Sequence, residues 1–173
     1  MGSLPETSDS LRSLPLLRGA ITLKSALEDD DDILQRITYP ERRLDFFTYL
    51  YTRRSEIEAI VSYHLGFEAE MCKVGEVKEW IAGSFNVCIP VYIDKRARHP
   101  RKRVLIRFPL PYKIGETQFP GNADEKIRCE AAAFIWLQEN CAAAVPIPSL
   151  WGFGFPNGQS VCYPKLHYPQ AVS

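Results

Sequence analysis

Three features of the chain carry residue types that could do chemistry: a glycine turn that could approach an anion, an arginine within an apolar strand and a glutamate on a helix. The first is Gly83, Ser84, Phe85 and Asn86, which stand between two stretches of strand-forming residues. A glycine in a tight hairpin lets backbone N–H groups approach an anion such as a phosphate. Most turns of this kind only connect two strands, so the motif alone is a weak signal.

Arg107 is the second feature, because it interrupts an apolar run over residues 104–108. This run predicts a strand that is buried on both faces, and a buried guanidinium requires a partner. The alternative is an arginine on an edge strand whose charged end reaches solvent.

Glu130 is the third feature. On a helix over residues 124–140, it shares a face with Ile127 and Phe134. A carboxylate within an apolar face also requires a partner. Arg107 and Glu130 would satisfy each other if this helix packs on the sheet. A purely structural ion pair explains the same pattern.

The elements that must position these residues follow from hydrophobic periodicity. Apolar residues alternate from Val87 to Ile93, which predicts a strand, and residues 74–80 and 104–108 supply two more. Pro90 lacks an N–H donor, so we expect it at a bulge or on a free edge. Asp124 would cap the helix that follows. A short strand over 149–155 and a turn at 156–158 complete an α+β fold, a small antiparallel sheet with one packed helix.

The flanking segments are less regular. Residues 1–40 contain the acidic run 28–32 and predict a mostly disordered leader with one short helix near 33–37. Apolar steps of three and four predict an amphipathic helical segment, or two helices broken near Arg53, with Gly66 as the C-terminal stop. The expected organisation is a leader over 1–40, the helical segment over 41–66, a sheet-and-helix lobe over 72–160 and an unstructured tail over 161–173.

Composition narrows the function classes. The 173 residues suit one domain or one lobe of a larger enzyme, and 46% hydrophobic and 24% charged residues are ordinary globular values. Lys+Arg and Asp+Glu both number 21, so the formal net charge is zero and nucleic acid is not expected as a partner. The basic run 95–103 could act as a nuclear import signal, but a solvated hairpin turn is the simpler interpretation.

The cysteines and the apolar runs indicate which cellular compartment to expect for the protein. Five widely spaced cysteines without a C-x-x-C pattern favour free thiols in a reducing, cytoplasmic environment. No apolar run approaches the roughly 18 residues of a membrane span, so no membrane association is expected. Zinc-ligand spacing is absent, and His64 is interpreted as a packing or capping residue. Cysteine nucleophile chemistry is not expected, since no histidine lies near Cys88 or Cys129 in sequence and both fall in expected core elements.

Taken in order, the glycine turn, the cation on a strand and the glutamate on a helix resemble a known family. The sequence is similar to the fungal branch of the aminoglycoside phosphotransferase-like (choline-kinase-like) enzymes, over residues 41–159. Their nucleotide-binding lobe has a protein-kinase-like fold. The matching segments are 80–88, 104–109, 124–131, 145–148 and 150–155.

The resemblance implies roles for the three features. Gly83, Ser84, Phe85 and Asn86 would form the loop over the ATP phosphates. Arg107 stands where the family places its phosphate-binding Lys or Arg, and the helix partner of that cation would be Glu130. Family members transfer the γ-phosphate of ATP to a hydroxyl of a small molecule, with magnesium.

The family's catalytic motif, His-Gly-Asp with a downstream Asn and a later metal-binding Asp, is not found. The residues that follow the three histidines are Leu65, Pro100 and Tyr168, and no carboxylate follows Glu139. We therefore expect no catalytic residue and no metal ligand here. The chain would be a truncated N-terminal lobe that binds ATP weakly if at all, with magnesium held only by a missing C-terminal lobe. The alternative is a non-catalytic, pseudokinase-like interaction module with a protein partner on the exposed inter-lobe face.

Overall fold

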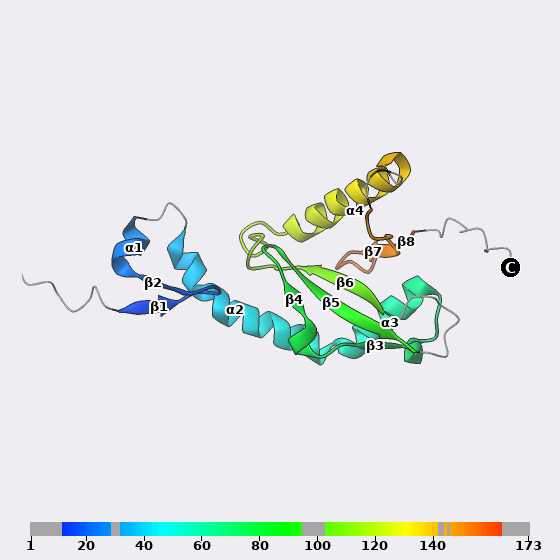
Figure 1. Ribbon diagram of the computed structural model, residues 1–173, viewed down its shortest axis with the longest axis horizontal. Coiled ribbons are helices and arrows are strands. Elements are labelled where there is room, and N and C mark those ends of the chain that lie inside the picture. Colours follow the sequence, from blue (N-terminus) through cyan, green and yellow to red (C-terminus); the bar gives the residue numbers. More distant parts are fainter. Residues whose placement is uncertain (1–11, 29–31, 95–102, 142–143, 145, 164–173) are drawn as a thin grey trace, which may run out of the picture. The chain divides into compact units, whose positions relative to one another are not determined.

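The computed structural model describes residues 12–28, 32–94, 103–141, 144 and 146–163 (Figure 1). The chain combines helices with small antiparallel sheets, as expected for the α+β class. It divides into two compact units, residues 1–51 and 52–173. The basic run 95–103 lies outside the described residues except for Arg103, and so do His99 and His167.

The first unit contains regular structure where a disordered leader was expected. Strand β1 (Ser13–Pro15) pairs antiparallel with β2 (Ala20–Thr22), and helix α1 (Leu23–Leu27) follows directly. The Thr22 hydroxyl caps α1 by accepting a hydrogen bond from the Ser25 N–H at 3.3 Å. Strands of three residues are too short to produce a detectable alternation, which is why the sequence pattern missed them.

The helical segment is broken where the periodicity predicted. Helix α2 (Ile33–Thr52) begins well before residue 41, and α3 (Arg54–Leu65) begins after a single intervening residue, Arg53. Gly66 ends α3 with φ of +70°, a left-handed conformation that glycine adopts without steric cost. Of the two alternatives, one helix or two helices broken near Arg53, the structure has the second, and the predicted glycine stop is confirmed.

The main sheet of the second unit is built around β5 (Asn86–Ile93). Strand β6 (Arg103–Pro109) pairs with one side of β5, while β3 (Cys72–Val74) and β4 (Ile81–Ala82) share the other side. Val87, Ile89 and Val91 are fully buried, which confirms the alternation predicted for this strand. This face of β5 is the core of the unit.

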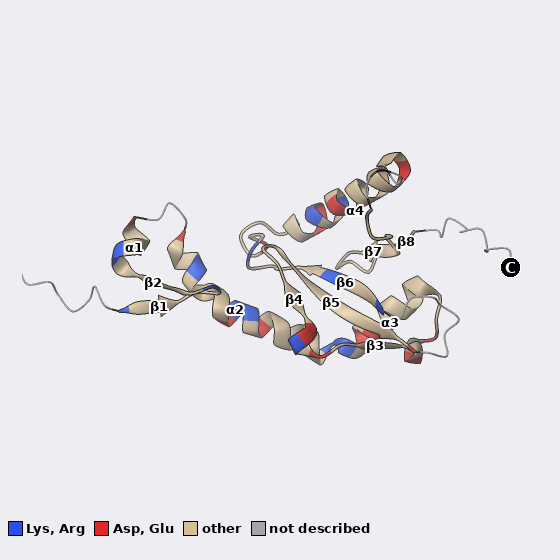
Figure 2. Cartoon of the chain, in the orientation of Figure 1, with Lys and Arg blue, Asp and Glu red and all other residues tan. Residues whose placement is uncertain are grey.

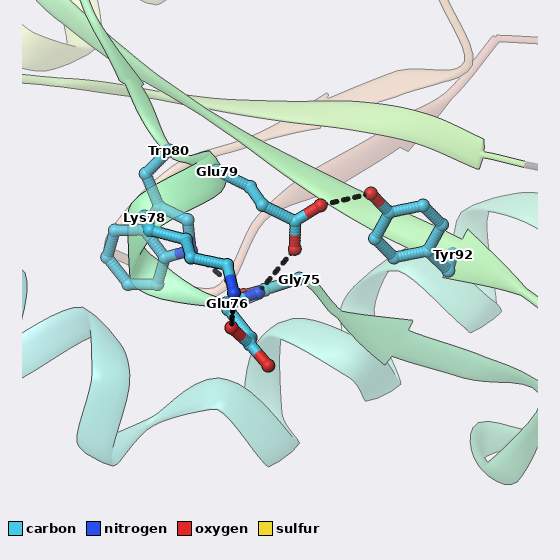
Figure 3. Close-up of polar contacts among 6 residues, drawn as sticks. All are labelled: Gly75, Glu76, Lys78, Glu79, Trp80 and Tyr92. Carbon is cyan, nitrogen blue, oxygen red and sulfur yellow. Dashed lines mark hydrogen bonds and ion pairs between the residues drawn. The ribbon is translucent and has the colours of Figure 1, made fainter.

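Residues 75–80 leave the sheet between β3 and β4 and form an arch (Figure 3). The Trp80 Nε1–H donates a buried hydrogen bond to the Gly75 carbonyl at 3.0 Å. The Glu79 carboxylate accepts from the Glu76 N–H at 2.8 Å and from the Tyr92 hydroxyl, and it lies between the arch and β5. These hydrogen bonds fix the arch against the central strand.

The arch also explains Pro90. The Gly75 N–H donates to the Pro90 carbonyl at 2.8 Å, and in a β-strand the nitrogen of a residue faces the same side as its carbonyl. The Pro90 nitrogen therefore faces the gap between β3 and β4, where no ladder hydrogen bond is required. Pro90 was expected at a bulge or on a free edge; it lies instead buried within the central strand, where its neighbour on one side is interrupted between β3 and β4.

The last helix of the unit is α4 (Asn122–Cys141), which runs alongside the β6 side of the sheet (Figure 1). It begins two residues before Asp124, so Asp124 is not its N-cap. The Glu116 carboxylate accepts from the Gly121 N–H at 2.8 Å and from the Ala123 N–H at 2.6 Å. The first turn of α4 is thus satisfied by a side chain from the preceding loop.

A second hairpin follows α4. Strand β7 (Gly152–Gly154) pairs antiparallel with β8 (Ser160–Cys162), and the Arg128 guanidinium lies 4.2 Å from the centre of the Phe155 ring. This cation–π contact joins the hairpin to α4. Strand β8 falls within the tail that was expected to be unstructured, because the pairing of two three-residue strands is not visible in the sequence.

Candidate functional site

Arg107 and Glu130 meet as the sequence predicted. The Arg107 Nη2 lies 3.5 Å from the Glu130 Oε1, which joins β6 to α4. The side chains are 46% and 30% exposed, so the expectation of a buried guanidinium was wrong. Among the described strands β6 pairs only with β5, and its side chains alternate between exposed and half-buried. Arg107 is therefore an edge-strand arginine whose charged end reaches solvent.

Asn86 holds the guanidinium from the other side. Its side chain is almost completely buried, and its amide is assigned with the oxygen toward the guanidinium, because that placement satisfies the polar atoms of both side chains. In this orientation the oxygen accepts from the Arg107 Nη2 at 2.6 Å and from Nε at 3.1 Å. Sequence reasoning placed Asn86 in a phosphate loop. In the fold it is the first residue of β5 and an anchor for Arg107.

Lys126 is a member of the cluster that sequence reasoning missed. Its Nζ contacts the Glu130 Oε1 from one helical turn earlier, so Glu130 lies between two cations. The i,i+4 spacing of Lys126 and Glu130 is visible in the sequence and would have indicated this pair. The cluster of Asn86, Arg107, Lys126 and Glu130 carries one net positive charge.

The loop between β4 and β5 does not offer the glycine chemistry that was expected. The Gly83 N–H donates to the Asn86 carbonyl at 2.8 Å, so this donor closes the hairpin instead of facing an anion. A Cβ on Gly83 would lie 3.6 Å from the same carbonyl oxygen, an ordinary contact, and its φ is not left-handed. Ser84 and Phe85 are exposed, and the Phe85 ring lies 5.9 Å from the Lys126 Nζ.

The guanidinium keeps donors for a ligand. Arginine has five N–H donors, and the contacts to Asn86 and Glu130 involve Nη2 and Nε. These contacts do not use Nη1, and the side chain is 46% exposed, so the guanidinium can still donate to an anion. With Lys126 beside it, the cluster can hold a phosphate or carboxylate group by charge-assisted hydrogen bonds.

An apolar strip lies on the same face of the sheet as Arg107. Cys88 is opposite Arg107 on one side and opposite Ile81 on the other, and Pro90 is opposite Leu105. Residues opposite each other in antiparallel strands share a face. Ile81 and Leu105 are 65% and 59% exposed. An exposed cation thus adjoins an exposed apolar surface.

In the described part of the chain, the two longest helices carry charges of both signs. Acidic and basic side chains are interspersed along α2 and along α4 (Figure 2). Within the described residues, no group of three His, Cys, Asp or Glu side chains is arranged to hold a metal ion. None of the helices in the described part of the chain is both long enough and apolar enough to cross a membrane.

Comparisons of this chain with protein-family models, with curated proteins and with solved structures found no match.

Proposed function

We propose that this chain is the nucleotide-binding lobe of an ATP-dependent phosphotransferase of the aminoglycoside phosphotransferase-like family. The observation that carries the proposal is the guanidinium of Arg107, which Asn86 on β5 and Glu130 on α4 hold in place although the Arg107 side chain stays 46% exposed. The order of hairpin, cation-bearing strand and glutamate-bearing helix supports it.

In this proposal Arg107 binds the phosphates of the nucleotide. Its two partners fix the guanidinium before the ligand arrives, which lowers the entropic cost of binding. Lys126 adds a second cation near the loop tip at Phe85. The apolar strip of Ile81 and Leu105 offers a flat surface for the base of the same nucleotide.

The described residues do not fit magnesium. Glu130 faces two cations, and no cluster of three ligands is available in the described part of the chain. We therefore derive no magnesium-dependent step from this lobe and assign metal binding and catalysis to a second lobe. Because ATP would then lie between two lobes, this lobe alone binds it weakly.

Titration of the whole ¹⁵N-labelled chain with ATP, followed by NMR, tests the proposal. We expect fast-exchange shifts at Asn86 and Arg107, with a dissociation constant of about 1 mM or weaker, on the order of 4 kcal/mol. The R107A variant should lose these shifts. The matched control is R103A, four residues earlier on the same strand and the same face, which should retain them. Shifts that are absent, or that survive in R107A, would overturn the role of Arg107.

A second candidate is a non-catalytic, pseudokinase-like interaction module. The exposure of Ile81 and Leu105 on one sheet face favours it, because exposed apolar side chains that share a face can bind a protein partner. Light scattering at high concentration separates the candidates. Self-association that L105K abolishes would favour the module, whereas a monomer that shows the ATP shifts favours the nucleotide-binding lobe.

A further inference from the structure

The fold brings together a histidine and a cysteine that are 98 residues apart in the sequence. His64 lies in the last turn of α3 and Cys162 ends β8. The Cys162 Sγ and the His64 Nδ1 are 3.2 Å apart, within hydrogen-bond distance for sulfur. The sequence indicated a packing or capping role for His64. Cysteine nucleophile chemistry was not expected, because no histidine lies near Cys88 or Cys129 in the sequence.

The imidazole of His64 occupies space that is open only because residue 152 is a glycine. Gly152 on β7 is directly opposite Cys162 in the hairpin register. A Cβ at position 152 would lie 2.2 Å from the His64 Nδ1 and 2.7 Å from the Val161 carbonyl oxygen. Gly152 thus leaves the space in which His64 reaches the thiol. The Tyr63 ring lies edge-on to the imidazole, with 5.5 Å between ring centroids.

The protonation state of His64 suits a base. Its side chain is half-buried, and burial lowers its pKa below the ordinary value of 6.5. At pH 7 the imidazole is therefore neutral. For Nδ1 to accept the thiol hydrogen bond, the ring proton must be on Nε2. Cys162 is exposed, so a small molecule in solvent can reach its sulfur.

We propose that Cys162 is a site of oxidation by peroxides, with His64 as the general base. The sulfur attacks one peroxide oxygen, so that an S–O bond forms and the O–O bond breaks. The thiol proton passes to the His64 Nδ1 and from there to the leaving hydroxide, which departs as water. The sulfur loses two electrons and the peroxide gains them. The product is a sulfenic acid. This proposal is independent of nucleotide binding.

The test treats the whole chain at pH 7 with a limiting amount of hydrogen peroxide in the presence of dimedone, which traps sulfenic acids. Peptide mass spectrometry then measures the adduct on each cysteine. Cys129 is the internal control: it is exposed on α4 and has no hydrogen bond to an imidazole in the described part of the chain. We expect Cys162 to react at least about tenfold faster than Cys129.

The H64N variant isolates the base. Asparagine can still accept a hydrogen bond near the Nδ1 position, but it cannot take up a proton at neutral pH. In H64N the rate at Cys162 should fall to that of Cys129, with the rate at Cys129 unchanged. Cys72, which is fully buried, must stay unmodified and so reports that the variant remains folded. Equal rates at Cys162 and Cys129 in the unaltered chain, or an unchanged rate in H64N, would overturn the proposal.

Discussion

The buried carboxamide of Asn86 accepts two hydrogen bonds from the guanidinium of Arg107, at 2.6 Å from Nη2 and 3.1 Å from Nε. The amide is the desolvated end of this contact, since the Arg107 side chain is 46% exposed. Breaking this contact should therefore cost free energy of unfolding mainly at Asn86 and not at the Arg107 guanidinium. A buried acceptor that loses its donor has no water to replace it, whereas the exposed guanidinium does.

R107A should destabilise the chain by about 1–3 kcal/mol, because it leaves the Asn86 oxygen without its donors. R107K keeps the charge but cannot reproduce a two-donor contact, so we expect a loss of about 1 kcal/mol. Urea unfolding of the whole chain measures both variants. In the N86A background the acceptor is gone and R107A should cost markedly less. If the effects of N86A and R107A are additive, the contact does not stabilise the fold.

The second prediction concerns Glu116 and the start of α4. E116A removes the acceptor for the Gly121 and Ala123 N–H groups and should cost about 0.5–2 kcal/mol in urea unfolding. E125A is the matched control, because Glu125 lies in the first turn and contributes only its charge to the helix dipole. We expect E125A to cost about 0.3–1 kcal/mol. Equal losses in the two variants would show that Glu116 acts through charge alone.

The sequence allowed prediction of features that depend on local periodicity. The alternation from Val87 to Ile93 indicated the central strand. The steps of three and four predicted the helical segment and its stop at Gly66, and offered the break near Arg53 as one of two alternatives. Arg107 and Glu130 were predicted to pair because each was an unsatisfied charge in an apolar pattern. Each of these predictions needed only the pattern within a single helix or strand, or the pairing of two opposite charges.

Features that depend on contacts between distant segments were not predictable in this way. The exposure of Arg107 follows from β6 pairing with β5 alone among the described strands, and a sequence does not give strand order. Pro90 is tolerated because the arch over residues 75–80 interrupts the pairing along the side of β5 that the Pro90 nitrogen faces. The contact between His64 and Cys162 requires the β7–β8 pairing, which three-residue strands conceal.

The third prediction concerns the contact between α3 and β3. The Glu58 carboxylate accepts from the Val74 N–H at 3.0 Å and pairs with Lys73 at 3.2 Å, and it is only 14% exposed. E58A should cost about 1–3 kcal/mol, because the part-buried N–H loses its acceptor. E58Q keeps an acceptor and loses only the ion pair with an exposed lysine, so its cost should stay below about 1 kcal/mol.

Urea unfolding measures these variants too, and E56A serves as their control. Glu56 lies on the same helix and pairs with Arg53 at 3.2 Å, but both side chains are largely exposed. Its removal loses an exposed ion pair and a charge in the first turn of α3, and should change the free energy of unfolding by less than about 1 kcal/mol. A loss in E58Q as large as that in E58A would assign the effect to the ion pair rather than to the hydrogen bond from β3.

The fourth prediction concerns the pH dependence of stability. Burial lowers the pKa of His64 below 6.5, so the unfolded chain binds more protons than the folded chain between the lowered pKa and 6.5. The free energy of unfolding should therefore be highest above pH 6.5 and fall as the pH decreases through that window. In H64N the fall should be smaller. Thermal unfolding between pH 8 and pH 5.5, in steps of about 0.5 unit, measures the difference in slope between the two chains.

An NMR titration of the imidazole Cε1–H resonances gives the pKa of His64 directly, and the signal that disappears in H64N identifies this residue. The groups that contact its ring in the described structure include the Cys162 thiol, the Tyr63 ring and the backbone of Gly152. We expect a midpoint below 6.5, since burial disfavours the charged imidazolium. A midpoint at 6.5 would contradict the expected effect of burial, and a midpoint above 7 would mean that the ring carries a proton at pH 7. In that case the neutral base required for oxidation of Cys162 would not be the resting form.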